Sequence, residues 1–311
     1  VDKATKLETI HNRIHEVRMR FEVMKRDAVI AHLRALLAEE GDPAALEAEL
    51  NATLARLDED FAFVAQCNVG GEFMAPDKIE RLQAIGRQTW TRTLDDRLGL
   101  SDDELRRRAP DEPPPPVEEP LLADKPWHRI PYETPVDLSL YEAEGFRMRP
   151  PEIRYNLGEL YNLSIGRGTL TAEDRFRINE HVVQTILMLK ALPFPRNLAR
   201  VPEWAGGHHE KMDGTGYPRG LTRDQMSLPA RMMAISDIFE ALTAADRPYK
   251  KPKTVGEALK IMSFMVKDQH IDPDLWALFL RSGVWREYAA AYLRPDQVDE
   301  VDVAALMPRG G

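Results

Sequence analysis

The chain has 311 residues, of which 43% are hydrophobic and 30% are charged, a composition that suits one large or two ordinary folded domains. Its formal net charge of −9 argues against a DNA- or RNA-binding protein, whose surface would be basic. A single cysteine, Cys67, excludes an internal disulfide and fits a reducing cytosol, and no apolar run approaches the roughly 20 residues that cross a bilayer. We therefore expect a cytoplasmic protein. Because the sequence starts at Val1 rather than Met, we interpret it either as a processed chain or as the end of a longer one, such as the cytoplasmic part of a membrane-anchored sensor.

Residues 1–40 carry a regular apolar seam, which predicts a helix that packs against another helix. The seam positions follow a 3-4-3-4 spacing: Leu7, Ile10, Ile14, Val17, Phe21, Met24, Ala28 and Ala31. Two interpretations stay open. The segment is either a signalling helix that pairs with a second copy in a homodimeric coiled coil, or an ordinary amphipathic helix that packs on its own domain.

Residues 41–109 read as a helical region. Apolar residues at helical spacing predict a helix over about 44–66, a second over about 77–98 and a short one over 101–108. Residues 110–151 begin with PDEPPPPVEEP. Proline fixes φ and cannot donate a backbone hydrogen bond, so this segment is a linker or an inserted loop, and the chain stays irregular as far as Pro151.

Residues 152–311 are again helical. A capping box of Thr171 with Asp174 opens a helix that reaches about Leu192. Further helices are expected from Pro202 to about Lys211, from Leu228 to about 244, over 254–266, and from Pro273 onward. No stretch alternates with period two for long enough to predict a strand. The predicted fold class is all-α, with a helical bundle over 152–311.

The segment GGHHEKMDGTGYP, residues 206–218, combines adjacent histidines with a glycine-rich turn. Imidazole pairs are common ligands of zinc, iron and manganese, so His208 and His209 are candidate metal ligands. Asp237 lies on a strongly apolar helix, where burying a carboxylate is costly unless a cation compensates it. His181 lies on another amphipathic helix and, taken alone, would be read as a core histidine.

Together these residues resemble one family. HHEKMDGTGYP, followed by ARMMAISDIFEALTAADRPYK at residues 230–250 and preceded by GTLTAEDRFRINEH at 168–181, is similar to the HD-GYP cyclic di-GMP phosphodiesterases. The resemblance implies a helical bundle in which histidines and aspartates hold two or three metal ions, often iron or manganese, for hydrolysis of cyclic di-GMP. The helices over 41–109 would then include the first helices of that bundle.

The resemblance also assigns roles to individual residues. It places metal ligands at His181, His208, His209 and Asp237, and phosphate contacts at Arg247 and Lys250. The GYP motif, Gly216, Tyr217 and Pro218, would lie near the substrate and at partner surfaces. Basic residues gather around these motifs and could attract an anionic ligand: Lys211, Arg219, Arg223, Arg247, Lys250, Lys251 and Lys253.

The name-giving HDxGK signature is altered. Tyr155 stands in the place of its histidine, Asn156 in the place of the bridging aspartate, and Glu159 in the place of the lysine, which resembles the YN-GYP variants of the family. A neutral amide cannot hold two cations together as an aspartate does, and Tyr155 is a poor ligand because its reference pKa is about 10. The resemblance also implies a histidine ligand on the family's first helix. No histidine occurs between His32 and His128, so this ligand is also missing unless the loop of His128 folds back.

We therefore expect at most one weakly held iron or manganese ion, on His181, His208 and His209, rather than a full two- or three-metal centre. Three functional hypotheses follow. The chain is a non-catalytic signalling module that binds cyclic di-GMP or docks a partner such as a diguanylate cyclase; or a phosphodiesterase with an altered metal set; or a structural dimerisation element.

Overall fold

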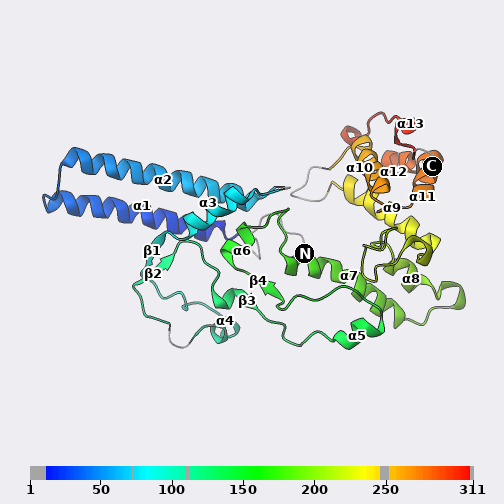
Figure 1. Ribbon diagram of the computed structural model, residues 1–311, viewed down its shortest axis with the longest axis horizontal. Coiled ribbons are helices and arrows are strands. Elements are labelled where there is room, and N and C mark those ends of the chain that lie inside the picture. Colours follow the sequence, from blue (N-terminus) through cyan, green and yellow to red (C-terminus); the bar gives the residue numbers. More distant parts are fainter. Residues whose placement is uncertain (1–11, 72, 110–111, 246–251, 309–311) are drawn as a thin grey trace. The chain divides into compact units, whose positions relative to one another are not determined.

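The computed structural model describes residues 12–71, 73–109, 112–245 and 252–308, which divide into two compact units (Figure 1). The N-terminal unit combines Val1–Thr134 with Pro151–Arg175, and the C-terminal unit combines Pro135–Pro150 with Phe176–Gly311. Helices dominate both units, so the all-α prediction is confirmed. Residues 151–175 pack with the N-terminal helices, and the domain boundary predicted at residue 152 stays a prediction.

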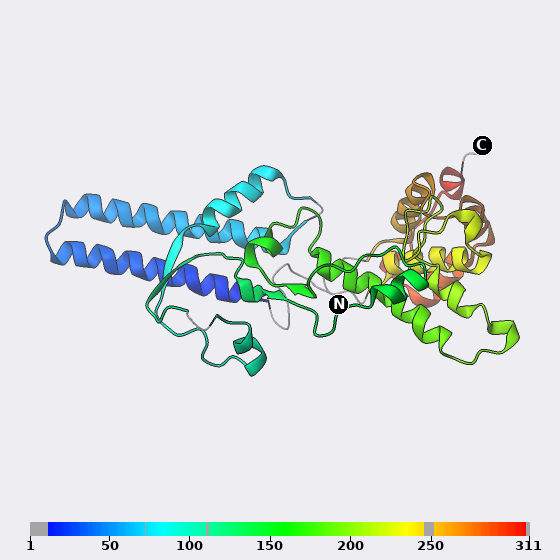
Figure 2. The ribbon, with the colours of Figure 1, turned by 60° about the horizontal axis from the view of Figure 1, so that its bottom comes forward.

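A long helical hairpin forms the first part of the N-terminal unit. Helix α1 spans Ile14–Leu37 and helix α2 spans Pro43–Val69, and the two run side by side in both ribbon views (Figures 1 and 2). The carboxylate of Asp42 accepts a hydrogen bond from the backbone N–H of Ala45 (3.3 Å), and Pro43 occupies the first turn. Both features are typical of a helix start, and they fix where the chain reverses.

The core of the N-terminal unit lies at the base of this hairpin. Val17 and Phe21 of α1 are almost completely buried and pack with Val64 of α2 and with Leu121 and Leu163. Ile14 belongs to the same core, so three seam residues are buried within their own unit. Leu7 and Ile10 lie outside the described residues. For Ile14, Val17 and Phe21 the structure therefore supports the amphipathic-helix interpretation, whereas Ala31 is exposed, and homodimerisation stays a prediction.

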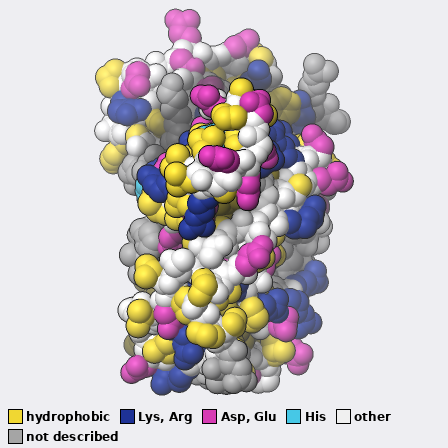
Figure 3. Space-filling model, turned by 90° about the vertical axis from the view of Figure 1, so that its left-hand side faces the viewer, with side chains coloured by type: hydrophobic (Ala, Val, Ile, Leu, Met, Phe, Trp, Pro, Cys, Tyr) yellow, Lys and Arg dark blue, Asp and Glu magenta, His cyan; other side chains and the backbone are white. Residues whose placement is uncertain are grey.

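The distal part of the hairpin is less well covered. Ile30, Leu33 and Leu37 expose 45%, 51% and 86% of their surface. Figure 3 shows hydrophobic side chains exposed beside charged ones on the face turned toward the viewer. None of the described helices combines the length and the apolar character that a membrane-crossing segment needs.

The predicted helix over 77–98 is only partly correct. Helix α3 spans Pro76–Gly86, and the chain then forms strand β1, Thr89–Arg92, antiparallel to strand β2, Val117–Pro120. A threonine, a tryptophan and a second threonine open β1, and these residue types favour an extended chain over a helix. The end of the proline-rich segment is thus part of a sheet.

Residues 123–151, predicted as irregular, contain a short strand and a short helix. Strand β3, Arg129–Ile130, pairs with β4, Tyr155–Asn156, and helix α5 spans Leu138–Ala143. Helix α5 belongs to the C-terminal unit. Two short helices complete the N-terminal unit, α4 at Asp102–Arg106 and α6 at Glu159–Leu163. Single 3-10 turns occur at Pro126–His128, Arg196–Leu198, Arg223–Gln225 and Pro295–Gln297.

The C-terminal unit is built from α5 and the remaining helices. They are α7 (Ala172–Lys190), α8 (Val201–Gly206), α9 (Leu228–Thr243), α10 (Val255–Lys267), α11 (Pro273–Ser282), α12 (Val284–Tyr292) and α13 (Val303–Leu306). The predicted capping box of α7 is present: the Thr171 hydroxyl accepts from the Asp174 N–H (3.1 Å) and the Asp174 carboxylate accepts from the Thr171 N–H (3.2 Å). One core surrounds Trp276, and a second surrounds Val182 and Ile186 of α7.

Candidate metal centre

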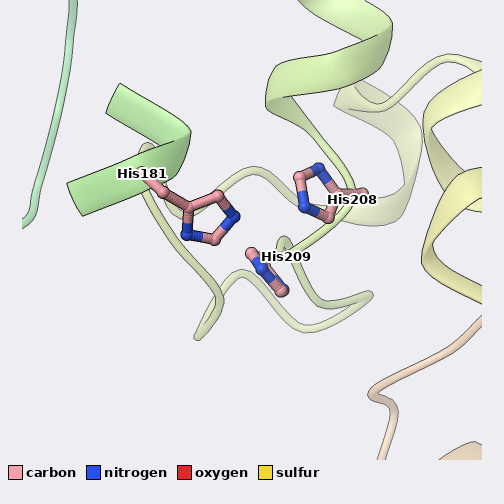
Figure 4. A group of neighbouring side chains, drawn as sticks. All are labelled: His181, His208 and His209. Atoms are coloured by element: carbon pink, nitrogen blue, oxygen red, sulfur yellow. The ribbon is translucent and has the colours of Figure 1, made fainter. Parts of the chain in front are cut away.

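Three imidazoles come together in the C-terminal unit. One possible ligand nitrogen from each of His181, His208 and His209 lies within 4.8 Å of the other two. His181 comes from α7, and the other two come from the turn that follows α8, so that the three rings face one another (Figure 4). Ligands of one tetrahedral ion lie about 3.3 Å apart, because metal–nitrogen bonds are about 2.0–2.1 Å long. Small ring rotations would therefore bring all three onto a single ion.

The hydrogen bonds of two of these rings leave a nitrogen free to bind metal. The Nδ1–H of His181 donates to the carbonyl oxygen of Ile178 (2.6 Å), and the Nδ1–H of His208 donates to that of Ala205 (2.6 Å). A carbonyl oxygen can only accept, so each ring must carry its proton on Nδ1. The lone pair then lies on Nε2, which is the usual arrangement of a metal-binding histidine.

The third imidazole is kept neutral by its surroundings. Burial, with smaller contributions from His208, His181 and His270, lowers the pKa of His209 to about 3. The ring of Tyr217 stacks on the His209 ring with centroids 4.8 Å apart, and burial together with the charge of Asp237 raises the pKa of Tyr217 to about 12. At neutral pH His209 is thus an uncharged nitrogen ligand beside a protonated phenol.

Glycine explains how the histidine turn reaches α7. Helix α8 ends at Gly206 rather than near Lys211 as predicted, and the histidines lie in the turn beyond it. A Cβ at Gly206 would lie 2.5 Å from a side-chain carbon of Ile186 on α7, closer than two carbons can approach. Only a glycine therefore permits this packing, which brings the turn against the helix that carries His181.

Glu210 holds the GYP loop, and the sequence analysis did not identify this role. Its side chain is 1% exposed. One carboxylate oxygen accepts from the N–H groups of Arg219 (2.7 Å) and Gly220 (3.1 Å), and the other accepts from that of Leu221 (2.7 Å). Burial nevertheless raises the pKa of Glu210, against the effect of these bonds. The signal in the sequence was an acidic residue placed directly before a glycine-rich turn, whose free N–H groups need acceptors.

Asp237 does not belong to the histidine group. Its side chain on α9 is exposed, so the burial cost that first marked it does not arise. Among the described residues, the group that could hold a metal consists of histidines alone. Asp237 acts on the site through its charge, which contributes to the raised pKa of Tyr217.

The predicted phosphate contacts cannot be compared with the structure, whereas two other basic residues near the motif can. Arg247 and Lys250 lie outside the described residues. Arg219 donates to Glu144 (3.1 Å), and Arg223 donates to Asp272 (2.9 Å). These two guanidinium groups are therefore engaged in ion pairs that fix loops, which reduces the charge available to an anionic ligand.

The altered signature residues belong to the N-terminal unit. Tyr155 and Asn156 form β4, and the guanidinium of Arg154 lies 5.4 Å from the centre of the Tyr155 ring. The side-chain oxygen of Asn156 accepts from the N–H of Gly158 (3.0 Å). The Asn156 side chain therefore stabilises a local turn, and this hydrogen bond requires no cation.

Glu159 is a buried structural residue. Its carboxylate accepts two hydrogen bonds from Arg20 of α1, each 2.8 Å long, and a third from the N–H of Ala123 (3.1 Å). Burial raises the pKa of this carboxyl, but the bonds and charge of Arg20 outweigh that effect and hold the pKa below its ordinary value. Arg13, the residue directly before α1, donates to the carbonyl oxygen of Leu157 (2.6 Å). The position that the resemblance gives to a lysine thus ties α6 to α1.

The loop of His128 does fold back, yet it supplies no ligand to this site. Its backbone carbonyl accepts from the Leu157 N–H (2.8 Å), beside β4. The Lys125 N–H donates to Nδ1 of the ring (3.2 Å), so the proton of the neutral ring lies on Nε2 and neither nitrogen offers a free lone pair. Burial lowers the pKa of His128 to about 4, although Glu159 opposes that shift.

The sequence of this chain is similar to one domain family and to several known proteins. A model of the HD domain family matches residues 116–275, just over half of the chain. A 3'3'-cGAMP-specific phosphodiesterase of Vibrio cholerae is 35% identical over 143 residues, which are 45% of this chain and 30% of that protein. A cyclic di-GMP phosphodiesterase of Pseudomonas aeruginosa is 45% identical over 75 residues, 24% of this chain and 17% of that protein.

A third relative, the cyclic di-GMP phosphodiesterase response regulator RpfG of Xanthomonas campestris, is 50% identical over 93 residues, 28% of this chain and 24% of that protein. The chain thus spans less than a third of the length of these relatives. The matched region includes all three histidines. The chain therefore belongs to the HD domain family, within its HD-GYP group.

Proposed function

We propose that this chain is a cyclic-dinucleotide signalling module that has lost the dinuclear hydrolytic centre of its family. It acts by binding cyclic di-GMP, or a related cyclic dinucleotide, or by docking a signalling partner such as a diguanylate cyclase. The observation that carries the proposal is the ligand set: three imidazoles, with no carboxylate in the group among the described residues.

The charge of this ligand set supports one ion rather than two. Two-metal hydrolytic sites hold their ions about 3.5–4 Å apart, and anionic oxygen ligands offset the repulsion between the cations. His181, His208 and His209 bring no negative charge. Asn156, at the place of the bridging aspartate, is neutral and serves a turn. One weakly held iron or manganese ion is the metal complement that fits these residues.

A second candidate is an active phosphodiesterase with an altered metal set. Three histidines with open coordination positions can make a hydrolytic site on one ion, and the relatives are phosphodiesterases by name. A third candidate is a structural dimerisation element, which the exposed apolar side chains of the distal hairpin favour.

Calorimetric titration with cyclic di-GMP and 3'3'-cGAMP, together with a turnover assay on the same manganese- or iron-loaded sample, separates the three. The proposed module binds at least one cyclic dinucleotide, or captures a cyclase domain, and does not hydrolyse the nucleotide. Turnover that disappears in His208→Ala would establish the second candidate instead. Neither binding, docking nor turnover would leave only the structural role.

A restoration experiment tests where activity was lost. Tyr155→His with Asn156→Asp returns the two residue types of the signature and leaves the Arg20–Glu159 pair intact. A gain of hydrolysis would assign the loss to this pair of positions. Unchanged activity would show that the centre has decayed more widely.

A further inference from the structure

A cavity of about 590 Å³ opens in the N-terminal unit, apart from the three histidines. Residues of α3, of α6 and of the first turn of α7 line it. Its lining includes the apolar residues Leu160, Ile165 and Leu170, together with two exposed residues of opposite charge, Arg87 and Asp124. This volume lies within the range of about 300–1,000 Å³ that is typical of small-molecule sites.

The two charged side chains lack ionic partners, unlike their neighbours. Lys125 pairs with Glu119 (2.8 Å) and Arg20 pairs with Glu159 (2.8 Å). Within the described ranges, no carboxylate lies within 4.0 Å of the Arg87 guanidinium, and Arg87 and Asp124 do not pair with each other. The side chain of Asp124 accepts one bond, from the Tyr161 N–H (3.1 Å) through Oδ1. Its other oxygen remains available.

We propose that this cavity binds an α-amino acid with an apolar or aromatic side chain. Arg87 offers a planar pair of donors, which suits a carboxylate. The free oxygen of Asp124 offers an acceptor for an ammonium group. The apolar lining residues Leu160, Ile165 and Leu170 then contact the apolar side chain, whose burial adds to the affinity.

The place of the cavity gives such a ligand a structural effect. It would contact α3, α6 and the start of α7 at once. Near the cavity the Tyr161 hydroxyl donates to Glu173 of α7 (3.0 Å), which already joins α6 to α7. Ligand that binds only the folded chain raises its stability by mass action, so occupancy tightens this junction at the beginning of the helix that carries His181.

Calorimetry with L-leucine and L-phenylalanine on the full chain tests the proposal. Three analogues remove one feature each: phenethylamine lacks the carboxylate, N-acetyl-L-phenylalanine lacks the ammonium group, and glycine lacks the side chain. Phenethylamine and N-acetyl-L-phenylalanine each lose a charged hydrogen bond, which weakens binding about ten- to a hundredfold. Glycine loses the burial of the apolar side chain. Each analogue is therefore expected to bind at least about tenfold more weakly than L-phenylalanine.

Two variants and one control complete the test. Arg87→Gln and Asp124→Asn are each expected to weaken L-phenylalanine about ten- to a hundredfold. Asn at position 124 still accepts from the Tyr161 N–H, so the fold is kept. Arg81→Gln, on the same helix, removes an arginine that packs on Phe63 and lies outside the cavity lining, and it should leave affinity unchanged.

The proposal is overturned if neither amino acid binds at millimolar concentration, if N-acetyl-L-phenylalanine binds as tightly as L-phenylalanine, or if Arg87→Gln leaves the affinity unchanged. Because the cavity is separate from the histidines, amino-acid binding does not depend on the outcome of the cyclic-dinucleotide titrations.

Discussion

The Arg20–Glu159 pair makes a sharp prediction, because the resemblance to the family places a lysine where this chain has Glu159. Both terminal nitrogens of Arg20 lie 2.8 Å from the carboxylate, and the Glu159 side chain is only 5% exposed. Glu159→Lys would therefore put a second cation against Arg20 in a nearly dry environment. Arg13 adds a further positive charge nearby.

The expected loss of stability follows from this burial. Removing one partner of a buried ion pair costs about 3–5 kcal/mol, because the other charge is left uncompensated. The lysine adds repulsion to that loss, so we expect Glu159→Lys to lower the free energy of unfolding by at least about 4 kcal/mol, a large share of the roughly 5–15 kcal/mol of a typical domain. Glu159→Gln keeps the shape without the charge and should cost about 1.5–3 kcal/mol.

Urea unfolding monitored by circular dichroism measures these differences. Glu152→Lys is the matched control, since its carboxylate is 84% exposed in the pair with Arg129, and it should change stability by less than about 1 kcal/mol. The exchanged pair Arg20→Glu with Glu159→Arg should recover part of the loss. If Glu159→Lys unfolds at the same urea concentration as the unaltered chain, this account of Glu159 is wrong.

Three other predictions follow from the structure. Gly216→Ala should destabilise the chain by about 1–3 kcal/mol, since its Cβ would lie 2.4 Å from the Lys211 nitrogen; Gly71→Ala, with nothing within 4 Å, is the control in thermal melts. The pKa of His128 is about 4 in the folded chain and about 6.5 in the unfolded chain. The stabilisation that the neutral ring gives to the folded chain is therefore complete above pH 6.5 and is lost as the pH drops toward 4. After allowance for partial exposure this amounts to about 1–2 kcal/mol, and His128→Gln should remove that slope from urea titrations; an identical slope in both proteins would contradict it. If the distal hairpin forms a homodimer, Leu33→Asp should give monomers in analytical ultracentrifugation, whereas unchanged sedimentation would exclude this face.

Local signals in the sequence were reliable guides to the fold. The starts of α2, α7 and α11 follow from Asp42, Thr171 and Asp272, because a capping side chain bonds to N–H groups two or three residues away. His208 and His209 were foreseeable from their own motif, whereas the ligand role of His181 followed only from the resemblance to the family.

Long-range interactions were not predictable in the same way. Arg20 lies 139 residues from Glu159, and nothing local marks the two as partners, so Glu159 was interpreted only as the replacement of the signature's lysine. Asp237 was selected because its helix is apolar, yet the amphipathic face turns it to solvent. The end of α3 at Gly86 likewise depends on contacts with Leu122 and Leu160, which come from distant segments.

The most direct measurement is the number of metal ions bound per chain. Elemental analysis of anaerobically purified, iron- or manganese-loaded protein should find at most one ion, and His181→Ala or His208→Ala should reduce it to background while the fold is preserved by circular dichroism. Two or more tightly held ions per chain, together with hydrolysis of a cyclic dinucleotide, would contradict the loss of the dinuclear centre.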